Sequence, residues 1–429
     1  LFIYNNFCII VVESNCAMKN NFLLEMQSRG FISQCTDLAN LEQYCNNKSI
    51  NGYIGFDCTA SSLHVGSLLQ IMILRLMQKY GHRPIVLLGG GTTLIGDPSG
   101  KDVTRKILEK KEIDRNIKSI KKIFNKILDT SDKKTKPIFV NNADWLTKLN
   151  YIKFLREIGS NFTINKMLTF DSVKLRLERE QSLSYMEFNY MILQAYDFYQ
   201  LFKTKNCILQ IGGSDQWGNI VNGVDLIRRI LKKNSFGLTT PLITLASGTK
   251  MGKTEKGAIW LNKELFSSYD YWQFWRNTDD RDVKKFLYFF TDIKTQEINN
   301  IYKNEKNINN LKILLANEAT KILHGEIAAK KAEKSAKDTF ESGGLGSDLP
   351  EIKVSSKEIN DGINFLDFLA LNKITTSKSE ARRAINNKGL KINNLLVVDE
   401  KKILEKKDFN DKILKISFGK KKHYLVKII

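Results

Sequence analysis

The sequence lacks several features that would assign it to a class at once. No apolar run approaches the roughly 20 residues that a membrane-spanning helix needs, so we expect a soluble protein. The six cysteines form no CxxC pair and no Cys/His cluster with metal-ligand spacing. They therefore indicate free thiols in a reducing compartment such as the cytoplasm, and they predict no metal site in the protein.

Common catalytic signatures are also missing. Only four histidines are present, and they form no Ser-His-Asp arrangement. Two glycine-containing segments approach the phosphate-binding pattern GxxxxGK[ST] but fail its spacing, residues 247–254 and residues 96–101. No internal repeat and no long low-complexity tract occurs. The sequence therefore favours neither a Ser-His-Asp enzyme nor a P-loop protein.

The composition is that of a folded, basic protein. With 429 residues, 42% of them hydrophobic, the chain can bury two or three cores, and disorder throughout is excluded. The formal net charge is +21. Such an excess suggests a polyanionic partner, because Lys and Arg that neutralise phosphates release counterions. A general bias of the composition toward Lys, Asn and Ile explains the charge equally well at this point.

Residues 22–240 alternate short β-branched runs with longer amphipathic stretches. This pattern predicts an α/β fold, with a parallel sheet and crossover helices. The clearest expected strands are residues 52–56, 83–88 and 207–211, and the clearest expected helices are residues 68–80 and 189–201.

Changes in composition along the chain suggest five segments. Residues 1–17 are interpreted as a non-native or disordered extension, with translation beginning at Met18; a targeting leader is the alternative. Residues 18–240 form the expected catalytic domain, 241–340 a helical, lysine-rich domain, and 341–357 a linker. Residues 358–429 form a small basic module of helices and strands. Basic charge after a flexible linker favours nucleic acid over mere solubility.

A first candidate site joins a strand end to a helix start. The strand ends near Asp57, and a helix is expected to begin between His64 and Ser67. Exposed amides and the dipole at a helix N-terminus favour phosphate. His64 can donate to phosphate oxygens, and Gly66 lets a nucleotide approach the backbone. A histidine before a helix is also a common structural cap, so both interpretations stay open here.

A second candidate site is the glycine-hinged loop of residues 248–254. Lys250 and Lys253 can move onto the β- and γ-phosphates of a nucleotide and meet charge that develops in the transition state. Considered singly, such a loop is more often a solvated turn.

A third candidate site lies on one predicted helix. Tyr190, Gln194 and Asp197 are spaced i, i+4 and i+7, so they share one face. Their span is about 10 Å at roughly 1.5 Å per residue. That length is comparable to tyrosine from its ammonium group to its phenol. Ordinary buried hydrogen-bonding side chains on a core helix are the alternative explanation.

Together these segments resemble the bacterial-type tyrosyl-tRNA synthetases, class I enzymes with a Rossmann-like catalytic domain. The likeness covers nearly the whole chain from Met18. It rests on residues 53–57, 94–101, 189–197, 209–220 and 274–282, while residues 64–67 and 250–254 resemble the two class I signature motifs.

The resemblance implies roles for individual residues. For the substrate tyrosine, the phenol would be read by Tyr53 and Asp197, the ammonium held by Asp97, Tyr190 and Gln194, and the carboxylate approached by Gln216. For ATP, the nucleotide would be bound by Asp57, Gly66, Ser67, Asp215 and Lys253. The α-phosphate and pyrophosphate would be stabilised by Thr59, His64, Lys101, Arg105, Lys250, Lys253 and Thr254.

Two positions depart from the family pattern. Ser67 stands where the family usually has His or Asn, so its contact with the ribose is open. Cys58 stands where the family usually has Pro, and we expect the loop there to be looser for it.

The resemblance further implies an activity and partners. The activity is that of a tyrosine–tRNA ligase, which forms tyrosyl-adenylate from tyrosine and ATP and passes tyrosine to the 3′-terminal adenosine of tRNA(Tyr). Mg²⁺ would accompany ATP, and the enzyme would be a homodimer. The last module resembles an S4-type RNA-binding domain, with Lys378, Arg382, Arg383 and Lys388 as candidate RNA contacts. Two alternatives are a tryptophan enzyme of the same architecture and a synthetase-like RNA-binding protein without catalysis.

Overall fold

The structure is a computed structural model. It describes residues 22–97, 108–249, 251–254, 257–341, 349–410, 412–419 and 422–429. The expected extension at residues 1–17 lies outside these ranges. The chain forms two compact units, one made of the described residues up to Ser61 with Leu69–Ile243, the other of Ser62–Leu68 with the described residues from Thr244 onward. Within the described ranges, no helix is both long and apolar enough to cross a bilayer.

The first unit is built on a six-stranded sheet with the strand order β1-β6-β5-β2-β3-β4. Its strands are β1 Gln34–Cys35, β2 Asn51–Phe56, β3 Arg83–Leu88, β4 Ile138–Asn141, β5 Cys207–Gly213 and β6 Phe236–Thr240. Strand β1 runs antiparallel to β6, and all other neighbours are parallel. The expected parallel sheet is therefore confirmed. Five of the six residues of β3 are buried, as is typical of a strand covered on both faces.

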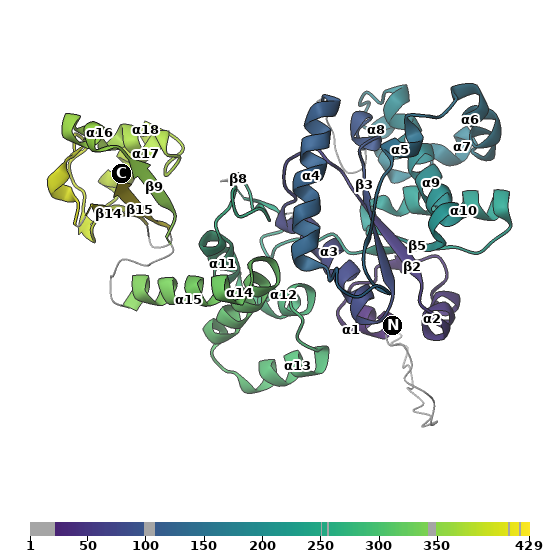
Figure 1. Ribbon diagram of the computed structural model, residues 1–429, viewed down its shortest axis with the longest axis horizontal. Coiled ribbons are helices and arrows are strands. Elements are labelled where there is room, and N and C mark those ends of the chain that lie inside the picture. The colour runs from purple at the N-terminus through teal and green to yellow at the C-terminus, as the bar shows by residue number, and fades with distance from the viewer. Residues whose placement is uncertain are drawn as a thin grey trace, which may run out of the picture. The chain divides into compact units, whose positions relative to one another are not determined.

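Helices cover both faces of this sheet. Figure 1 shows α4 on one side and α9 with α10 on the other. The helices of this unit are α1 Phe22–Ser28, α2 Leu38–Asn47, α3 Val65–Lys79, η1 Thr92–Leu94, α4 Lys110–Ile127, α5 Ala143–Leu146, α6 Tyr151–Glu157, η2 Gly159–Asn161, α7 Ile164–Met167, α8 Asp171–Glu178, α9 Tyr185–Lys205, η3 Ser214–Gln216 and α10 Trp217–Leu231. The first turn of α3, up to Leu68, belongs to the second unit.

The long helix α9 has clear signals at both ends. It starts at a capping box, in which the Ser184 side chain accepts from the Glu187 N–H and the Glu187 carboxylate accepts from the Ser184 N–H. It ends at Asn206, which adopts a left-handed conformation with φ 49°. The ends fix the helix that carries three of the candidate site residues.

The strand order places a topological switch point between β2 and β5, near the centre of the sheet. Strands β2 and β5 are neighbours, and the chain proceeds from β2 to β3 and from β5 to β6 toward opposite edges. Ligands of open α/β sheets bind at the carboxyl ends of strands at such a switch point. Asp57 follows β2 directly, and η3 follows β5 directly.

The second unit begins with a hairpin and a group of helices. The elements are β7 Lys253–Thr254, β8 Gly257–Ala258, α11 Ser268–Arg276, η4 Asp280–Asp282, α12 Val283–Phe290, α13 Thr295–Asn304, α14 Ile308–His324 and α15 Glu326–Glu341. An aromatic core joins α11 to α12. The ring centroid of Trp275 lies 4.8 Å from that of Phe290 and 5.9 Å from that of Phe286.

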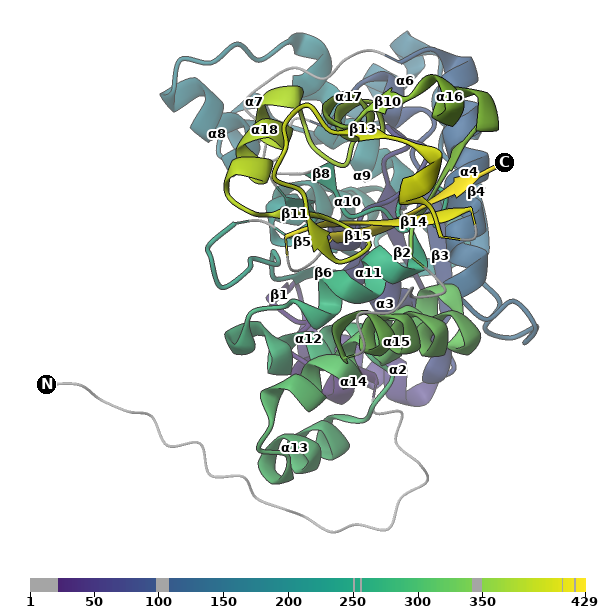
Figure 2. The same cartoon turned by 90° about the vertical axis from the view of Figure 1, so that its left-hand side faces the viewer.

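The C-terminal part forms a five-stranded sheet with the order β12-β11-β14-β15-β9. Its elements are β9 Glu351–Val354, α16 Ser356–Asp361, β10 Ile363–Asn364, α17 Phe365–Leu371, α18 Lys378–Asn386, β11 Leu390–Ile392, β12 Leu395–Leu396, β13 Ile403–Leu404, η5 Lys406–Asp408, β14 Ile413–Phe418 and β15 Lys422–Ile428. The helices α16, α17 and α18 lie to one side of the sheet (Figure 2). Buried side chains from both layers, such as Phe365, Ile385 and Val426, form its core.

The end of the linker predicted from the sequence, residue 357, is too late in the chain. Residues 351–354, expected to belong to a linker at 341–357, form β9, which pairs in parallel with β15. The alternation of polar and apolar residues in Glu351–Val354 is only four residues long and follows a Gly- and Ser-rich stretch. The composition of the segment therefore did not reveal the strand. The folded module therefore begins before residue 358.

Candidate functional site

Tyr53 and Asp197 are both buried in the first unit, close enough for the Asp197 charge to act on the Tyr53 hydroxyl. Each side chain is 1% exposed. Burial and, second, the nearby charge of Asp197 raise the pKa of Tyr53 well above its ordinary value. The Tyr53 ring packs against Phe198, with centroids 5.4 Å apart. Its hydroxyl is buried without a hydrogen-bond partner among the described residues, so it can still bind a polar group.

Two side chains that sequence reasoning missed hold the Asp197 carboxylate. Trp145 Nε1 donates to Oδ1 over 2.7 Å, and Asn142 Nδ2 donates to Oδ2 over 2.9 Å. Burial nevertheless raises the pKa of Asp197 to about 7, because these hydrogen bonds only partly offset the loss of water. The signal that could have found both residues is their place just after β4, at the carboxyl end of a parallel strand.

A second polar cluster joins three of the candidate residues. Gln216 Nε2 donates to Asp97 Oδ2 over 2.9 Å. Asn219 Nδ2 donates over 3.1 Å to Gln216 Oε1 and over 3.1 Å to Gln194 Oε1. Asn219 was also missed, although it lies in the first turn of α10, three residues after the N-cap residue Gln216. The cluster offers amide and carboxylate groups suited to an amino acid's ammonium and carboxylate.

The remaining candidates of the first unit lie on α9 and at strand ends. Tyr190 is buried within α9. Asp215 lies on η3, where its Oδ1 is 2.6 Å from the place that a Cβ on Gly213 would occupy. Only glycine fits there without moving the carboxylate. Asp57 is half-buried after β2, and Thr59 is exposed two residues later.

Hydrogen bonds fix the backbone at Cys58, while a loop looser than one with proline stays a prediction. The Cys58 N–H donates to Thr93 Oγ1 over 2.9 Å, and Asn116 Nδ2 donates to the Cys58 carbonyl over 2.9 Å. The side chain of Cys58 is fully buried. Hydrogen bonds thus hold this residue, and a proline could not make the first of them.

The two segments that resemble the class I signature motifs, residues 64–67 and the described part of residues 250–254, meet in the second unit. His64 forms an antiparallel bridge with Trp260, and the flanking bonds run from Val65 N to Ile259 O (2.8 Å) and from Leu261 N to Leu63 O (2.9 Å). The backbone of the loop of residues 248–254, called the lysine loop below, adjoins the imidazole of His64 at Gly252. A Cβ on Gly252 would lie 2.6 Å from His64 Nδ1.

The imidazole of His64 has a defined donor side. Gly66 N donates to His64 Nδ1 over 3.1 Å, so Nδ1 is the acceptor and Nε2 carries the proton. Ser67 lies in the first turn of α3, and its N–H donates to His64 O over 2.8 Å. An Nε2–H donor at a helix start can bind a phosphate oxygen.

The lysine loop is described in part. The backbone of Lys253 and Thr254 forms β7, which pairs with Ala258 and Gly257 of β8. The side chains of these two residues lie outside the described part of the structure. Lys101, Arg105 and Lys250 lie outside the described residues.

The candidate RNA contacts lie on α18 and the turn after it, and all four are exposed. Lys378 pairs with Asp367 at 2.6 Å, and Arg382 pairs with Glu400 at 2.9 Å. Exposed pairs such as these contribute little stability. Arg383 and Lys388 make no ion pair with any residue the structure describes.

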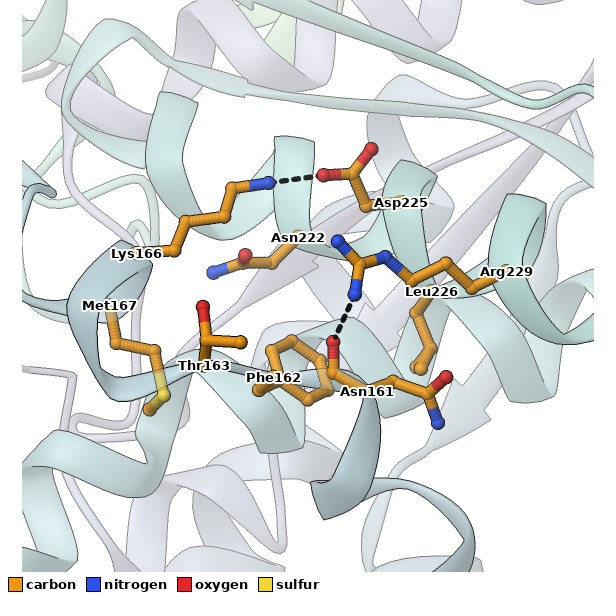
Figure 3. Close-up of a pocket in the computed structure, with 9 residues that line it drawn as sticks. All are labelled: Asn161, Phe162, Thr163, Lys166, Met167, Asn222, Asp225, Leu226 and Arg229. Atoms are coloured by element: carbon orange, nitrogen blue, oxygen red, sulfur yellow. Dashed lines mark hydrogen bonds and ion pairs between the residues drawn. The ribbon is translucent and has the colours of Figure 1, made fainter.

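A small hollow elsewhere in the first unit contains none of these candidates (Figure 3). Lys166 bridges to Asp225 across it, and Arg229 donates to the carbonyl of Asn161 over 2.9 Å. Its cations are thus already engaged, so it is a poorer candidate for a substrate site than the switch point between β2 and β5. The lining residues are Asn161, Phe162, Thr163, Lys166, Met167, Asn222, Asp225, Leu226 and Arg229.

Comparisons with known proteins agree with this geometry. Residues 45–341 match the family model described as class I tRNA synthetases (W and Y), and residues 341–426 match a tyrosine–tRNA ligase C-terminal domain. A tyrosine–tRNA ligase from Pelagibacter ubique is 62% identical, covering 96% of this chain and all of that protein. One from Rhodopseudomonas palustris is 52% identical, covering 96% of this chain and 99% of that protein.

The chain belongs to the tyrosyl-tRNA synthetase family.

Solved structures agree. A C-terminally truncated mitochondrial tyrosyl-tRNA synthetase from Aspergillus nidulans covers 76% of this chain and 95% of its own, with a TM-score of 0.67 at 29% identity. That from Coccidioides posadasii covers 74% and 92%, with a TM-score of 0.64 at 31% identity. The chain is an aminoacyl-tRNA synthetase with tyrosine–tRNA ligase activity, and ATP is one of its substrates.

Proposed function

We propose that the buried pocket of Tyr53 and Asp197 selects tyrosine by its phenol. The single observation that carries this is the buried Tyr53 hydroxyl, which lacks a partner among the described residues and lies near the Asp197 carboxylate. A phenol can bond both groups, whereas phenylalanine leaves the buried Tyr53 hydroxyl unpaired and the Asp197 carboxylate with only its bonds to Trp145 and Asn142. Tyrosyl-tRNA synthetases are the standard example of such discrimination, which needs no editing.

The second polar cluster holds the other end of the amino acid in this proposal. Asp97, Tyr190 and Gln194 bind the ammonium, and Gln216 lies near the carboxylate. The hydrogen bonds through Asn219 support this assignment, because they hold the amides of Gln194 and Gln216 in place before substrate arrives.

The phosphate-binding groups come from both signature motifs. Asp57, Gly66, Ser67 and Asp215 bind ATP, while Thr59 and His64 meet charge on the α-phosphate and pyrophosphate. The cations Lys101, Arg105, Lys250 and Lys253, with Thr254, close over the pyrophosphate. The Nε2 donor of His64 and its contact with the loop backbone support the part given to this residue.

The reaction needs positioning more than acid–base chemistry. The tyrosine carboxylate attacks the α-phosphate in line, pyrophosphate leaves, and tyrosine then passes to a terminal ribose hydroxyl of tRNA(Tyr). Because the attacking group is already an anion, no strong base is required. Mg²⁺ enters with ATP as part of that substrate.

The chain acts as a homodimer in this proposal. Large apolar side chains are exposed on the short helices α6 to α8 and the first turn of α9: Tyr151, Ile152, Ile164, Leu168, Leu175, Leu177 and Tyr185. The hydroxyls of Tyr151 and Tyr185 lie 3.1 Å apart, so α6 and α9 contribute to one surface. Such a surface fits a second copy. Ile152→Glu should give monomers in light scattering, and dimers would refute this surface.

The C-terminal module binds the tRNA backbone with Lys378, Arg382, Arg383 and Lys388. Its basic composition and exposed α18 support this role. We also place the protein in the cytoplasm, where free thiols such as Cys45 and Cys207 persist.

The test of the proposed specificity is ATP–pyrophosphate exchange with each of the twenty amino acids. Tyrosine alone should drive exchange, and Asp197→Ala should lower the preference for tyrosine over phenylalanine by at least about tenfold. Exchange driven by tryptophan instead would identify the related tryptophan enzyme. RNA binding without exchange would identify a protein that has lost catalysis.

A further inference from the structure

The loop after β2 has one buried fixed point between two residues proposed to act on ATP. Cys58 is fully buried, whereas Asp57 is half-buried and Thr59 is exposed. The position of the outer two therefore depends on how the Cys58 backbone is held.

Both peptide groups of Cys58 are held, by two different elements. Thr93, on η1, accepts from the Cys58 N–H, and Asn116, on α4, donates to the Cys58 carbonyl, each over 2.9 Å. Thr93 and Asn116 are themselves buried, at 5% and 6% exposure. Thr93 is further fixed because its N–H donates to Gly89 O over 2.8 Å. The planes of the peptides toward Asp57 and toward Thr59 are thus both set.

The thiol of Cys58 is not needed for this. Burial raises its pKa to about 12, so it stays neutral at physiological pH. Its Sγ contacts the Phe56 carbonyl at 3.6 Å. What the residue supplies is an N–H group, which proline lacks.

We propose that Thr93 and Asn116 are positioning residues for adenylate formation: they clamp the Cys58 backbone and so orient Asp57 and Thr59 toward ATP. The inference rests on the proposed roles of Asp57 and Thr59. It adds residues that touch neither substrate. Small losses of orientation slow reactions that depend on positioning, and a buried N–H left unpaired favours a shifted loop.

The adjacent residue Thr92 provides a matched control. Its Oγ1 accepts from Asn142 Nδ2 over 2.9 Å, and that same amide donates to Asp197. The two neighbouring threonines of η1 therefore support two different binding sites, one for ATP and one for tyrosine. Thr93 holds the ATP loop, and Thr92 supports the pocket for the phenol.

The experiment is tyrosine-dependent pyrophosphate exchange by the full chain. Thr93→Val should lower kcat/KM for ATP about tenfold with KM for tyrosine within about twofold. Thr93→Ser, which keeps the hydroxyl, should stay within about twofold of wild type. Thr92→Val should instead raise KM for tyrosine. A Thr93→Val variant that changes both substrates equally would overturn the proposal.

A double-mutant cycle tests the bond itself. Cys58→Pro removes the N–H, so adding Thr93→Val should then have less than about a twofold effect. The same tenfold loss in that background would overturn the clamp. If Cys58→Pro does not fold, Asn116→Leu decides: a loss confined to ATP supports the proposal, and wild-type kinetics refute it. Cys58→Ala keeps both peptide groups and should behave as wild type. An ATP-specific loss in this variant would show that the thiol itself is needed.

Failure of the underlying function is separable from failure of the clamp. A wild-type chain without tyrosine-dependent exchange overturns the proposed function and this inference with it. A wild-type chain that is active, but whose Thr93→Val variant is unaffected, overturns the clamp alone.

Discussion

The indole N–H of Trp145 donates to the carboxylate of Asp197 over 2.7 Å, although the two residues are 52 positions apart in the chain. Asn142 binds the other carboxylate oxygen. The buried carboxylate is thereby held in one orientation. Its readiness to accept a hydrogen bond from a phenol depends on both donors.

Trp145→Phe should therefore weaken tyrosine binding about tenfold, because a hydrogen bond to a charged group is lost. KM for ATP should stay unchanged. Equilibrium dialysis with tyrosine and exchange kinetics with ATP measure the two effects. Trp272→Phe is a matched control, since that indole also donates over 2.7 Å, to Asn317 in the second unit. Equal losses in both variants would show a general effect on folding.

Tyrosine binding should depend on pH around neutrality. Burial raises the pKa of Asp197 to about 7, so the group is protonated below that pH and ionised above it. The ionised form accepts the stronger, charge-assisted hydrogen bond. The affinity for tyrosine should thus rise as pH increases from 6 to 8 and then level off. A fluorescence titration measures it. Asp197→Asn should flatten the profile, and an unchanged profile in that variant would assign the dependence to another group.

Gly252→Ala should slow adenylate formation at least about tenfold without weakening tyrosine binding. The added Cβ would lie 2.6 Å from His64 Nδ1, and the φ of +114° is unfavourable for alanine. Gly257→Ala separates the two causes. Gly257 has φ +113°, and among the described residues no atom beyond its chain neighbours lies within 4 Å of the added Cβ. Single-turnover adenylate formation should be slowed far less in this control; equal slowing would point to backbone strain alone.

Arg383→Gln should weaken tRNA binding more than Arg382→Gln. Arg382 is engaged with Glu400, whereas Arg383 has no ion-pair partner among the described residues. The dependence of log affinity on log salt should become shallower by about one unit for Arg383→Gln, as expected for one lost phosphate contact. Filter binding at several salt concentrations checks this. An unchanged slope would remove Arg383 from the interface.

The sequence predicted the scaffold well because its signals were local. The strands at Asn51–Phe56 and Arg83–Leu88 and the helix around Asp197 all follow from hydrophobic period and capping. The spacing of Tyr190, Gln194 and Asp197 on that helix was also readable. These features need no knowledge of distant contacts.

What the sequence did not predict depends on distant contacts. Asn142 and Trp145 reach Asp197 from another strand end, and Asn219 joins two glutamines across helices. No motif marks such residues, since each is defined only by what the fold brings beside it. The hydrogen bonds that hold Cys58 are of the same kind. A local rule about proline could not foresee partners 35 and 58 residues away.

The parallel pairing of β9 with β15 determines where the C-terminal module can be cut. A fragment that starts at residue 358 would lose β9 and leave the backbone groups of β15 unpaired along an open edge. Open edges of this kind recruit other chains and aggregate. Recombinant versions of the C-terminal module should consequently start at or before Leu349, and deletions at the C-terminus that reach Leu425 would strip partners from two strands at once.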